Sequence, residues 1–254
     1  MTESELQVVR AAGFLAAAVA ALVLQRLVPH GGLRGSWRVN GALWVVDALV
    51  VGLVCGACAC AAARSAERAG IGLLHLGAVD GVAAVLVTVL ALDLTSYWWH
   101  RANHRVPLLW RFHQVHHSDR TFTVSTGLRF HPGELLLSLP VRLAAVVLVG
   151  APVRAVLIFE IAFTIANLVE HGDIRLGRRF ERTLGWLLVT PALHRRHHTA
   201  TAPARDTNFG TIFAIWDRSF RSFAPNDSLT RVVTGLPGLG DVSLTRALLL
   251  PFGR

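Results

Sequence analysis

The chain has 254 residues, of which 53% are hydrophobic and 16% are charged, whereas a soluble domain usually carries about 25% charged residues. This composition excludes an ordinary soluble domain and indicates a protein embedded in a membrane. The formal net charge of +9 would also suit a nucleic-acid-binding protein, but the arginines lie between apolar segments and no nucleic-acid motif is present, so we expect them to face lipid headgroups instead.

Five apolar segments are candidates for membrane helices, because a hydrocarbon core about 30 Å thick requires about 20 helical residues. The predicted spans are residues 8–28, 41–63, 77–99, 134–150 and 153–170. The last two are short and meet at Ala151-Pro152, which predicts a hairpin that enters the membrane and returns to the same side. Arginines concentrate after the first and third spans and after residue 170. The positive-inside rule therefore places these regions in the cytoplasm and the N-terminus outside.

The histidines are the most informative residues, and ten of them lie between His100 and His198, in regions predicted to be cytoplasmic. Eight form three clusters with spacings of three or four residues, which place side chains on one face of a helix. The clusters are His100 and His104; His113, His116 and His117; and His194, His197 and His198. Thr190-Pro191 predicts the start of the helix that carries the last cluster. Eight imidazoles exceed the roughly six positions around one octahedral ion, so the sequence predicts two metal ions.

Spacing alone does not identify the metal, since imidazole binds zinc, copper, iron and nickel. Zinc would indicate a membrane lipid hydrolase that uses metal-bound water, whereas activation of oxygen would require iron. A metal transporter is a third interpretation. Transport requires polar residues through both halves of the membrane, and the clustered histidines lie on one side only, which argues against it.

Several motifs around these histidines resemble those of the fatty acid hydroxylase and sterol desaturase superfamily. The resemblance covers roughly residues 90–220, with the blocks in the family's order. The matching blocks are Asp93-Leu-Thr-Ser-Tyr97-Trp-Trp-His100-Arg-Ala-Asn-His104, Leu109-Trp-Arg-Phe-His113-Gln-Val-His116-His117-Ser118, Arg129-Phe-His131-Pro132-Gly-Glu134, Thr190-Pro191-Ala-Leu-His194-Arg-Arg-His197-His198, Asp206-Thr-Asn208-Phe-Gly210 and Trp216-Asp217-Arg218-Ser-Phe220.

The resemblance implies an all-α, polytopic membrane helical bundle with a cytoplasmic helical cap that carries the histidine site. Residues 77–225 would form the catalytic domain, with N-terminal spans in 1–76 and a tail in 226–254. It implies an enzyme that holds two iron ions and uses O2 as co-substrate to hydroxylate or desaturate a fatty acyl, sterol or carotenoid-like lipid. No haem, flavin or pyridine-nucleotide motif is present, so we expect a separate electron donor of the ferredoxin or cytochrome b5 type with its reductase.

At the matching positions, the resemblance makes metal ligands of all eight clustered histidines and adds His171 as a ninth. Some members of the family carry a further histidine where this chain has Asn167, which leaves Asn167 as an extra ligand or a supporting residue. His131 is open between a ligand, a residue that supports a ligand and a helix cap, and we favour the last two.

Other polar residues are expected to support the site without binding metal. Asp93, in the third predicted span, would either accept a hydrogen bond from a ligand imidazole or pair with an arginine. Asp206 and Asn208, in the polar turn after the last cluster, are expected to hydrogen-bond ligand histidines. Asp217 is expected to form an ion pair with its neighbour Arg218.

Overall fold

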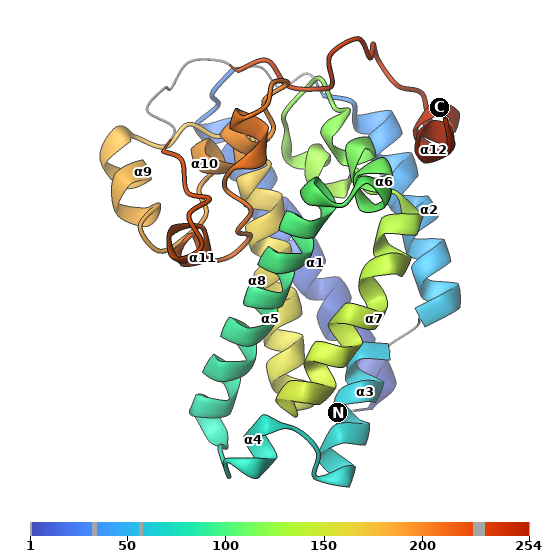
Figure 1. Ribbon diagram of the computed structural model, residues 1–254, viewed down its shortest axis with the longest axis vertical. Helices are drawn as coiled ribbons and strands as arrows, with labels where there is room; N and C mark the ends of the chain where they lie inside the picture. The colour runs from blue at the N-terminus through green and yellow to red at the C-terminus, as the bar shows by residue number, and fades with distance from the viewer. Residues whose placement is uncertain (1, 32–34, 56–57, 226–231, 254) are drawn as a thin grey trace.

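The structure is a computed structural model that describes residues 2–31, 35–55, 58–225 and 232–253, and within these ranges it is built from helices (Figure 1). The predicted all-α fold class is confirmed. Three helices are long and apolar enough to cross a membrane, namely Glu3–Leu27 (α1), Gly81–Arg105 (α5) and Pro132–Val149 (α7). The helices Trp37–Cys55 (α2) and Val153–Glu170 (α8) complete the bundle. The chain is an integral membrane protein.

The shorter helices lie mainly at the two ends of the bundle. They are Cys58–Ala69 (α3), Leu73–Leu76 (α4), Pro107–His117 (α6), Arg178–Leu184 (α9), Pro191–His197 (α10), Ile215–Ser219 (α11) and Leu244–Leu249 (α12), with 3-10 turns at Val124–Leu128, Ala204–Asp206 and Leu250–Phe252. The N-terminus, α3 and α4 lie towards one end, whereas α6 and the helices from α9 onwards cover the other (Figure 1). We call this second end the cap.

The helix α5 connects the membrane bundle to the cap. Its 25 residues give it a length of about 37 Å at 1.5 Å per residue, which exceeds a hydrocarbon core about 30 Å thick. His100 and His104 lie in its last two turns. The helix is therefore long enough to cross such a core and still carry both histidines in the cap.

The helices α7 and α8 form the predicted hairpin. Gly150 ends α7 with a φ of 70°, in the left-handed region that commonly terminates a helix, and Pro152 precedes the first residue of α8. From this turn the two helices diverge towards the cap, while α5 packs against both (Figure 1). The divergence leaves room beneath the cap for the cavity described below.

The second predicted span, residues 41–63, is covered by α2 up to Cys55 and by α3 from Cys58. Residues 56 and 57 between them lie outside the described residues, so the extent of this span stays a prediction. Three charged residues follow in α3, which are Arg64, Glu67 and Arg68. Charged side chains strongly oppose burial in lipid, and α3 packs against α7 and α8 instead.

Three of the five predicted spans meet the requirements of length and apolar character among the described residues. The helix α8 is apolar over most of its 18 residues, but it carries Arg154, Glu160 and Glu170. The five-crossing topology stays a prediction, as does the division of the chain at residues 77 and 226.

Candidate metal centre

Four parts of the chain bring nine histidines together in the cap. The end of α5 carries the first cluster. The helix α6, which begins at Pro107, carries the second. His171 follows the last residue of α8. The predicted start of α10 is confirmed, because the Thr190 side chain accepts a hydrogen bond from the backbone N–H of Leu193 and Pro191 begins the helix. The helix α10 then presents the last cluster.

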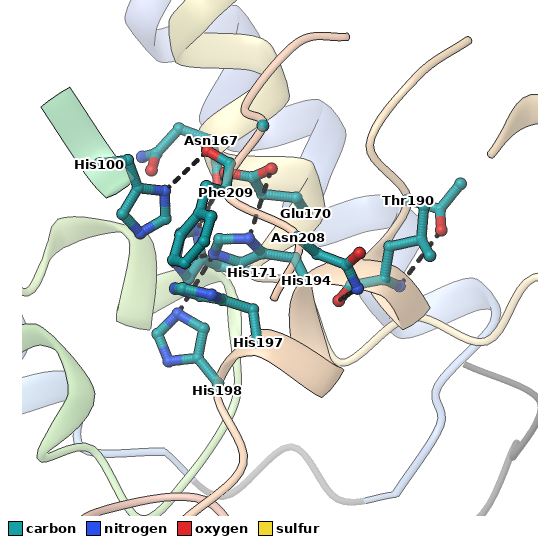
Figure 2. A network of polar contacts seen from close by, with 12 residues as sticks. His100, Asn167, Glu170, His171, Thr190, His194, His197, His198, Asn208 and Phe209 are labelled. Atoms are coloured by element: carbon teal, nitrogen blue, oxygen red, sulfur yellow. Dashed lines mark hydrogen bonds and ion pairs between the residues drawn. The ribbon is translucent and has the colours of Figure 1, made fainter. Parts of the chain in front are cut away.

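The nine histidines form two groups, in each of which one nitrogen atom per ring lies within 4.8 Å of the others. The five-histidine group consists of His100, His104, His113, His117 and His197, and the four-histidine group consists of His116, His171, His194 and His198. Every histidine that the resemblance makes a ligand falls into one group or the other. Rings of both groups lie side by side in Figure 2.

The helices α6 and α10 each contribute to both groups. Residues four apart differ by about 40° around a helix, whereas residues three apart differ by about 60° in the opposite sense. His113 and His117 accordingly enter the five-histidine group, while His116 enters the other. In α10 and its cap residue the arrangement is reversed, since His194 and His198 share the four-histidine group. The clusters of α6 and α10 therefore join the two groups, whereas His100 and His104 both belong to the five-histidine group.

Backbone carbonyl oxygens orient four of the rings. The carbonyl oxygens of Phe209, Arg129, Asn167 and Thr207 accept hydrogen bonds from Nδ1 of His100, His116, His171 and His197, at 2.9, 3.1, 2.6 and 2.8 Å respectively. A carbonyl oxygen only accepts, so Nδ1 carries the proton in each ring and Nε2 presents a lone pair. This is the arrangement in which an outer hydrogen bond sets the tautomer of a metal-binding histidine.

Carboxylates orient two further rings of the five-histidine group. Nδ1 of His104 lies 3.2 Å from Oδ1 of Asp206, so the contact predicted for Asp206 is present. Nδ1 of His113 lies 2.9 Å from Oε1 of Glu134, a buried residue in the first turn of α7 that also accepts from Asn103. Sequence reasoning assigned Glu134 no role, although it closes one of the quoted motifs.

The Nε2 atoms of these rings either have no hydrogen-bond partner among the described residues or face another Nε2 atom. In the five-histidine group, the buried Nε2 atoms lack hydrogen-bond partners among the described residues. In the four-histidine group, Nε2 of His171 lies 3.0 Å from Nε2 of His116 and 2.9 Å from Nε2 of His194. His116 and His171 both carry their protons on Nδ1, so two lone pairs face each other.

A cation removes this repulsion. Nitrogen atoms bound at right angles to one ion, at about 2.1 Å each, would lie about 3 Å apart, which matches the spacing in the four-histidine group. The donor set consists of imidazoles, which suit iron, zinc, copper and nickel. Burial lowers the pKa of His171 to about 4 and that of His197 to about 3, so both rings are neutral at pH 7. The residues therefore fit two bound metal ions.

The interpretation of Asp93 was wrong in both its forms. Among the described residues Asp93 contacts neither a histidine nor an arginine. Its carboxylate accepts hydrogen bonds from the backbone N–H groups of Ile212 and Phe213 and from Nε1 of Trp216. Asp93 thus fastens the loop after Phe209, whose carbonyl oxygen orients His100.

Asp217 fastens the same loop and does not pair with Arg218. Its carboxylate accepts from the backbone N–H groups of Phe209 and Gly210, at 2.7 and 2.8 Å. The Arg218 guanidinium instead donates to the carbonyl oxygen of Gly185 and lies 3.6 Å from the ring centroid of Phe223. The sequence-neighbour ion pair was therefore a wrong prediction.

Asn208 and Asn167 act through the backbone. The Asn208 side chain donates to the carbonyl oxygens of Leu193 and Ala224 and points away from the histidine rings (Figure 2). The predicted hydrogen bond from Asn208 to a ligand histidine is absent from the described structure. The Asn167 side chain donates to the Gly127 carbonyl oxygen, so Asn167 supports His171 with its own carbonyl group and belongs to neither histidine group.

His131 is a helix cap. Its Nδ1 accepts from the backbone N–H of Gly133 at the start of α7, and its Nε2 lies 3.1 Å from the carbonyl oxygen of Leu248. These contacts use both ring nitrogens and join α7 to α12. His131 lies outside both histidine groups. The helix cap of the preferred interpretation is present, whereas its other part, a hydrogen bond that supports a ligand histidine, is absent from the described structure.

A cavity of about 290 Å³ adjoins the histidines between α5, α7 and α8. His100, His116, His171 and His194 lie in its wall, which continues towards the membrane bundle over apolar side chains such as Phe159 and Phe163. Glu170 also lines it, with a carboxylate oxygen 3.7 Å from Nδ1 of His194. Sequence reasoning assigned Glu170 no role, and its position next to His171 was the available signal.

Buried imidazoles form two groups beside a largely apolar cavity in a membrane helical bundle. The chain is therefore a histidine-rich membrane protein with a site suited to two metals. The family model described as fatty acid hydroxylase matches residues 85–222, more than half of the chain. The chain belongs to the fatty acid hydroxylase family, and the resemblance noted in the sequence is confirmed.

Curated relatives have the names of lipid oxidoreductases. Alkylglycerol monooxygenase of Danio rerio is 32% identical over 152 residues, which are 58% of this chain and 31% of that protein. Ornithine lipid hydroxylase OlsE of Rhizobium tropici is 31% identical over 175 residues, 67% of this chain and 50% of that protein. Human lathosterol oxidase is 25% identical over 159 residues, 60% and 49% of the two chains. The chain thus spans half of these relatives' length or less. No solved structure matches it significantly.

Proposed function

We propose that the chain is a membrane-bound di-iron enzyme that uses O2 to hydroxylate or desaturate a lipid. The observation that carries this proposal is that histidines of both groups form one wall of a largely apolar cavity between membrane helices. Such a cavity takes a hydrocarbon chain and brings one of its carbons to the site. The names of two relatives, alkylglycerol monooxygenase and ornithine lipid hydroxylase, favour hydroxylation of a polar lipid.

Each histidine group would hold one iron ion, with the nine histidines as ligands. Zinc has no redox chemistry, whereas the monooxygenase, hydroxylase and oxidase names of the relatives imply a redox-active metal. When bound, the iron pair supplies the redox chemistry with O2 that breaks a C–H bond of the substrate. The chain's own residues orient the rings through Nδ1, and aromatic side chains of the cavity keep water from the reacting carbon.

The remaining parts of the proposal concern the surroundings of the site. The arginine distribution supports a cytoplasmic position of the cap, and with it of the histidines. Electrons would come from a separate ferredoxin or cytochrome b5-type donor with its reductase. Asp206 and Glu134 would hold their rings through charge-assisted hydrogen bonds, while Asp93, Asn167, Asn208 and His131 would act only by holding the surrounding backbone in place.

Metal analysis of protein purified without oxygen tests the proposal. We expect about two iron ions per chain, and O2 consumption coupled to oxidation of a lipid in extracts of the host. Zinc without iron, together with no O2 consumption, would show a hydrolase instead. The variant His197→Ala should insert into the membrane as the unaltered chain does but lose oxidation, and retained activity would contradict the assignment of ligands.

A further inference from the structure

Arg142 is a charged residue in the middle of a membrane helix. It lies ten residues after Pro132 in α7, which corresponds to about 15 Å along the helix axis. The same helix is apolar enough to cross a membrane. Ionisable residues at such positions are costly and usually mark a functional site with a specific partner.

Arg142 lies where two cavities adjoin. The first is the cavity beside the histidines, and the second, also about 290 Å³, lies farther from the cap among residues of α1, α3, α5, α7 and α8. Ser96, Arg142, Phe159 and Glu160 line both. The Arg142 guanidinium lies 5.3 Å from the ring centroid of Phe163 on α8, so it is directed across the bundle, between α7 and α8.

Glu160, the acid that lines both cavities with Arg142, already has a partner. Oε2 of Glu160 accepts from Nε of Arg10 at 2.7 Å, and Oε1 accepts from Nη2 of Arg10 at 3.0 Å. Arg142 forms no ion pair within 4.0 Å anywhere in the described parts of the chain. Glu134 and Glu170 also line the first cavity, but neither forms an ion pair with Arg142. The exposed Arg142 side chain therefore has no direct carboxylate partner among the described residues and can take an external anion.

We propose that Arg142 binds the anionic group of the lipid substrate, either a carboxylate or a phosphate. Arginine suits both groups because its planar fork binds two oxygen atoms at once. The hydrocarbon chain runs from Arg142 through the first cavity to the histidines. This inference rests on the proposed function for the oxidation step, but the binding of an anionic lipid does not depend on it.

The geometry also determines which carbon is oxidised. Eight residues of α7 separate Arg142 from Glu134, which orients His113, and this separation corresponds to about 12 Å along the helix. An anionic group held at Arg142 therefore places beside the histidines a carbon at a fixed distance from that group, on the order of 12 Å or less because the side chain leans towards the start of α7. We expect the oxidised position to be counted from the anionic end, whatever the total chain length.

Lipid binding without oxygen tests the inference, since no turnover is then needed. The full-length, metal-loaded protein is equilibrated with palmitate, with palmitoyl lysophosphatidic acid or with neutral hexadecanol, and the bound lipid is measured by mass spectrometry. One of the two anions should bind about ten- to hundredfold more tightly than hexadecanol, the effect of a hydrogen-bonded charge. The preferred anion distinguishes carboxylate from phosphate. Equal binding of all three lipids overturns the inference by itself.

Variants then assign the preference to Arg142. Arg142→Gln should bind the anion no more tightly than hexadecanol, and Arg142→Lys should retain part of the preference. The control Arg154→Gln removes an exposed arginine from α8, outside both cavities, and should keep the preference in full. A preference that survives in Arg142→Gln overturns the inference. Intact preference without lipid oxidation would instead contradict the proposed function alone, and oxidation of neutral lipids without any preference would contradict this inference alone.

Discussion

Nε2 of His116 lies 3.0 Å from Nε2 of His171, although Nδ1 of each ring already donates its proton to a backbone carbonyl oxygen. Two lone pairs therefore face each other inside the protein, where little water screens them. The hydrogen bonds that produce this contact come from two distant parts of the chain, Arg129 and Asn167. The fold holds the rings in an arrangement that a cation stabilises, so metal binding and stability should be linked.

Removal of the metal should lower the thermal stability of the protein. A ligand present at about a hundred times its dissociation constant contributes about 2.7 kcal/mol, which corresponds to about 5–10 °C in a chain of this size. Thermal unfolding in detergent, before and after treatment with a chelator, measures the difference. Adding iron back should restore the original midpoint, and a midpoint that does not change on chelation would contradict two occupied sites.

Single ligand variants should each weaken the binding of one ion. His171→Ala leaves three histidines in the four-histidine group and His197→Ala leaves four in the five-histidine group, so each should lower the bound metal below about two ions per chain, and His171→Ala should lower it further. Elemental analysis of the purified variants measures this content. His75→Ala is the matched control, because His75 is exposed on α4 outside both groups. Unchanged metal content in both ligand variants would show that the groups are not metal sites.

Replacing the carboxylate behind His113 should weaken metal binding more than replacing the one behind His104. Glu134 is buried and lies 2.9 Å from its histidine, whereas Asp206 is partly exposed and lies 3.2 Å from its own. Loss of such a supporting group typically weakens metal affinity by about 10–100-fold, and we expect the upper part of this range for Glu134→Gln and the lower part for Asp206→Asn. Competition with a chelator of known affinity measures both, and the reverse order would contradict the role of burial.

The metal-free protein should lose stability in acid. Burial lowers the pKa of His171 to about 4 and that of His197 to about 3, below the value of about 6.5 in an unfolded chain. The unfolded chain therefore binds protons first, so the stability present above pH 6.5 falls as the pH falls towards 4. Between pH 7 and pH 5 the loss is about 2 kcal/mol for each of these histidines.

Thermal unfolding of chelated protein across this range measures the effect. The metal-loaded protein should resist the same change of pH better, because bound ions compete with protons for the ring nitrogens. A midpoint that stays constant or rises as the metal-free protein is acidified would mean that the rings are already protonated in the folded state.

Local patterns in the sequence predicted much of the bundle and its histidine site. Apolar runs marked α1, α5, α7 and α8 because membrane helices depend on length and hydropathy. The spacing of His194, His197 and His198 predicted rings projecting from one helix because helical geometry is local. The family motifs added His171.

The sequence by itself determined that many imidazoles lie near one end of a membrane bundle. Only the tertiary structure decided how they are divided between the two groups: His116 belongs to the group of His171, whereas His113 and His117 belong to the other. It also decided that Asp93 and Asp217 hold a loop, and that backbone carbonyl groups orient four of the rings. These contacts join residues far apart in the chain, and a carbonyl group leaves no signature in the sequence because every residue carries one.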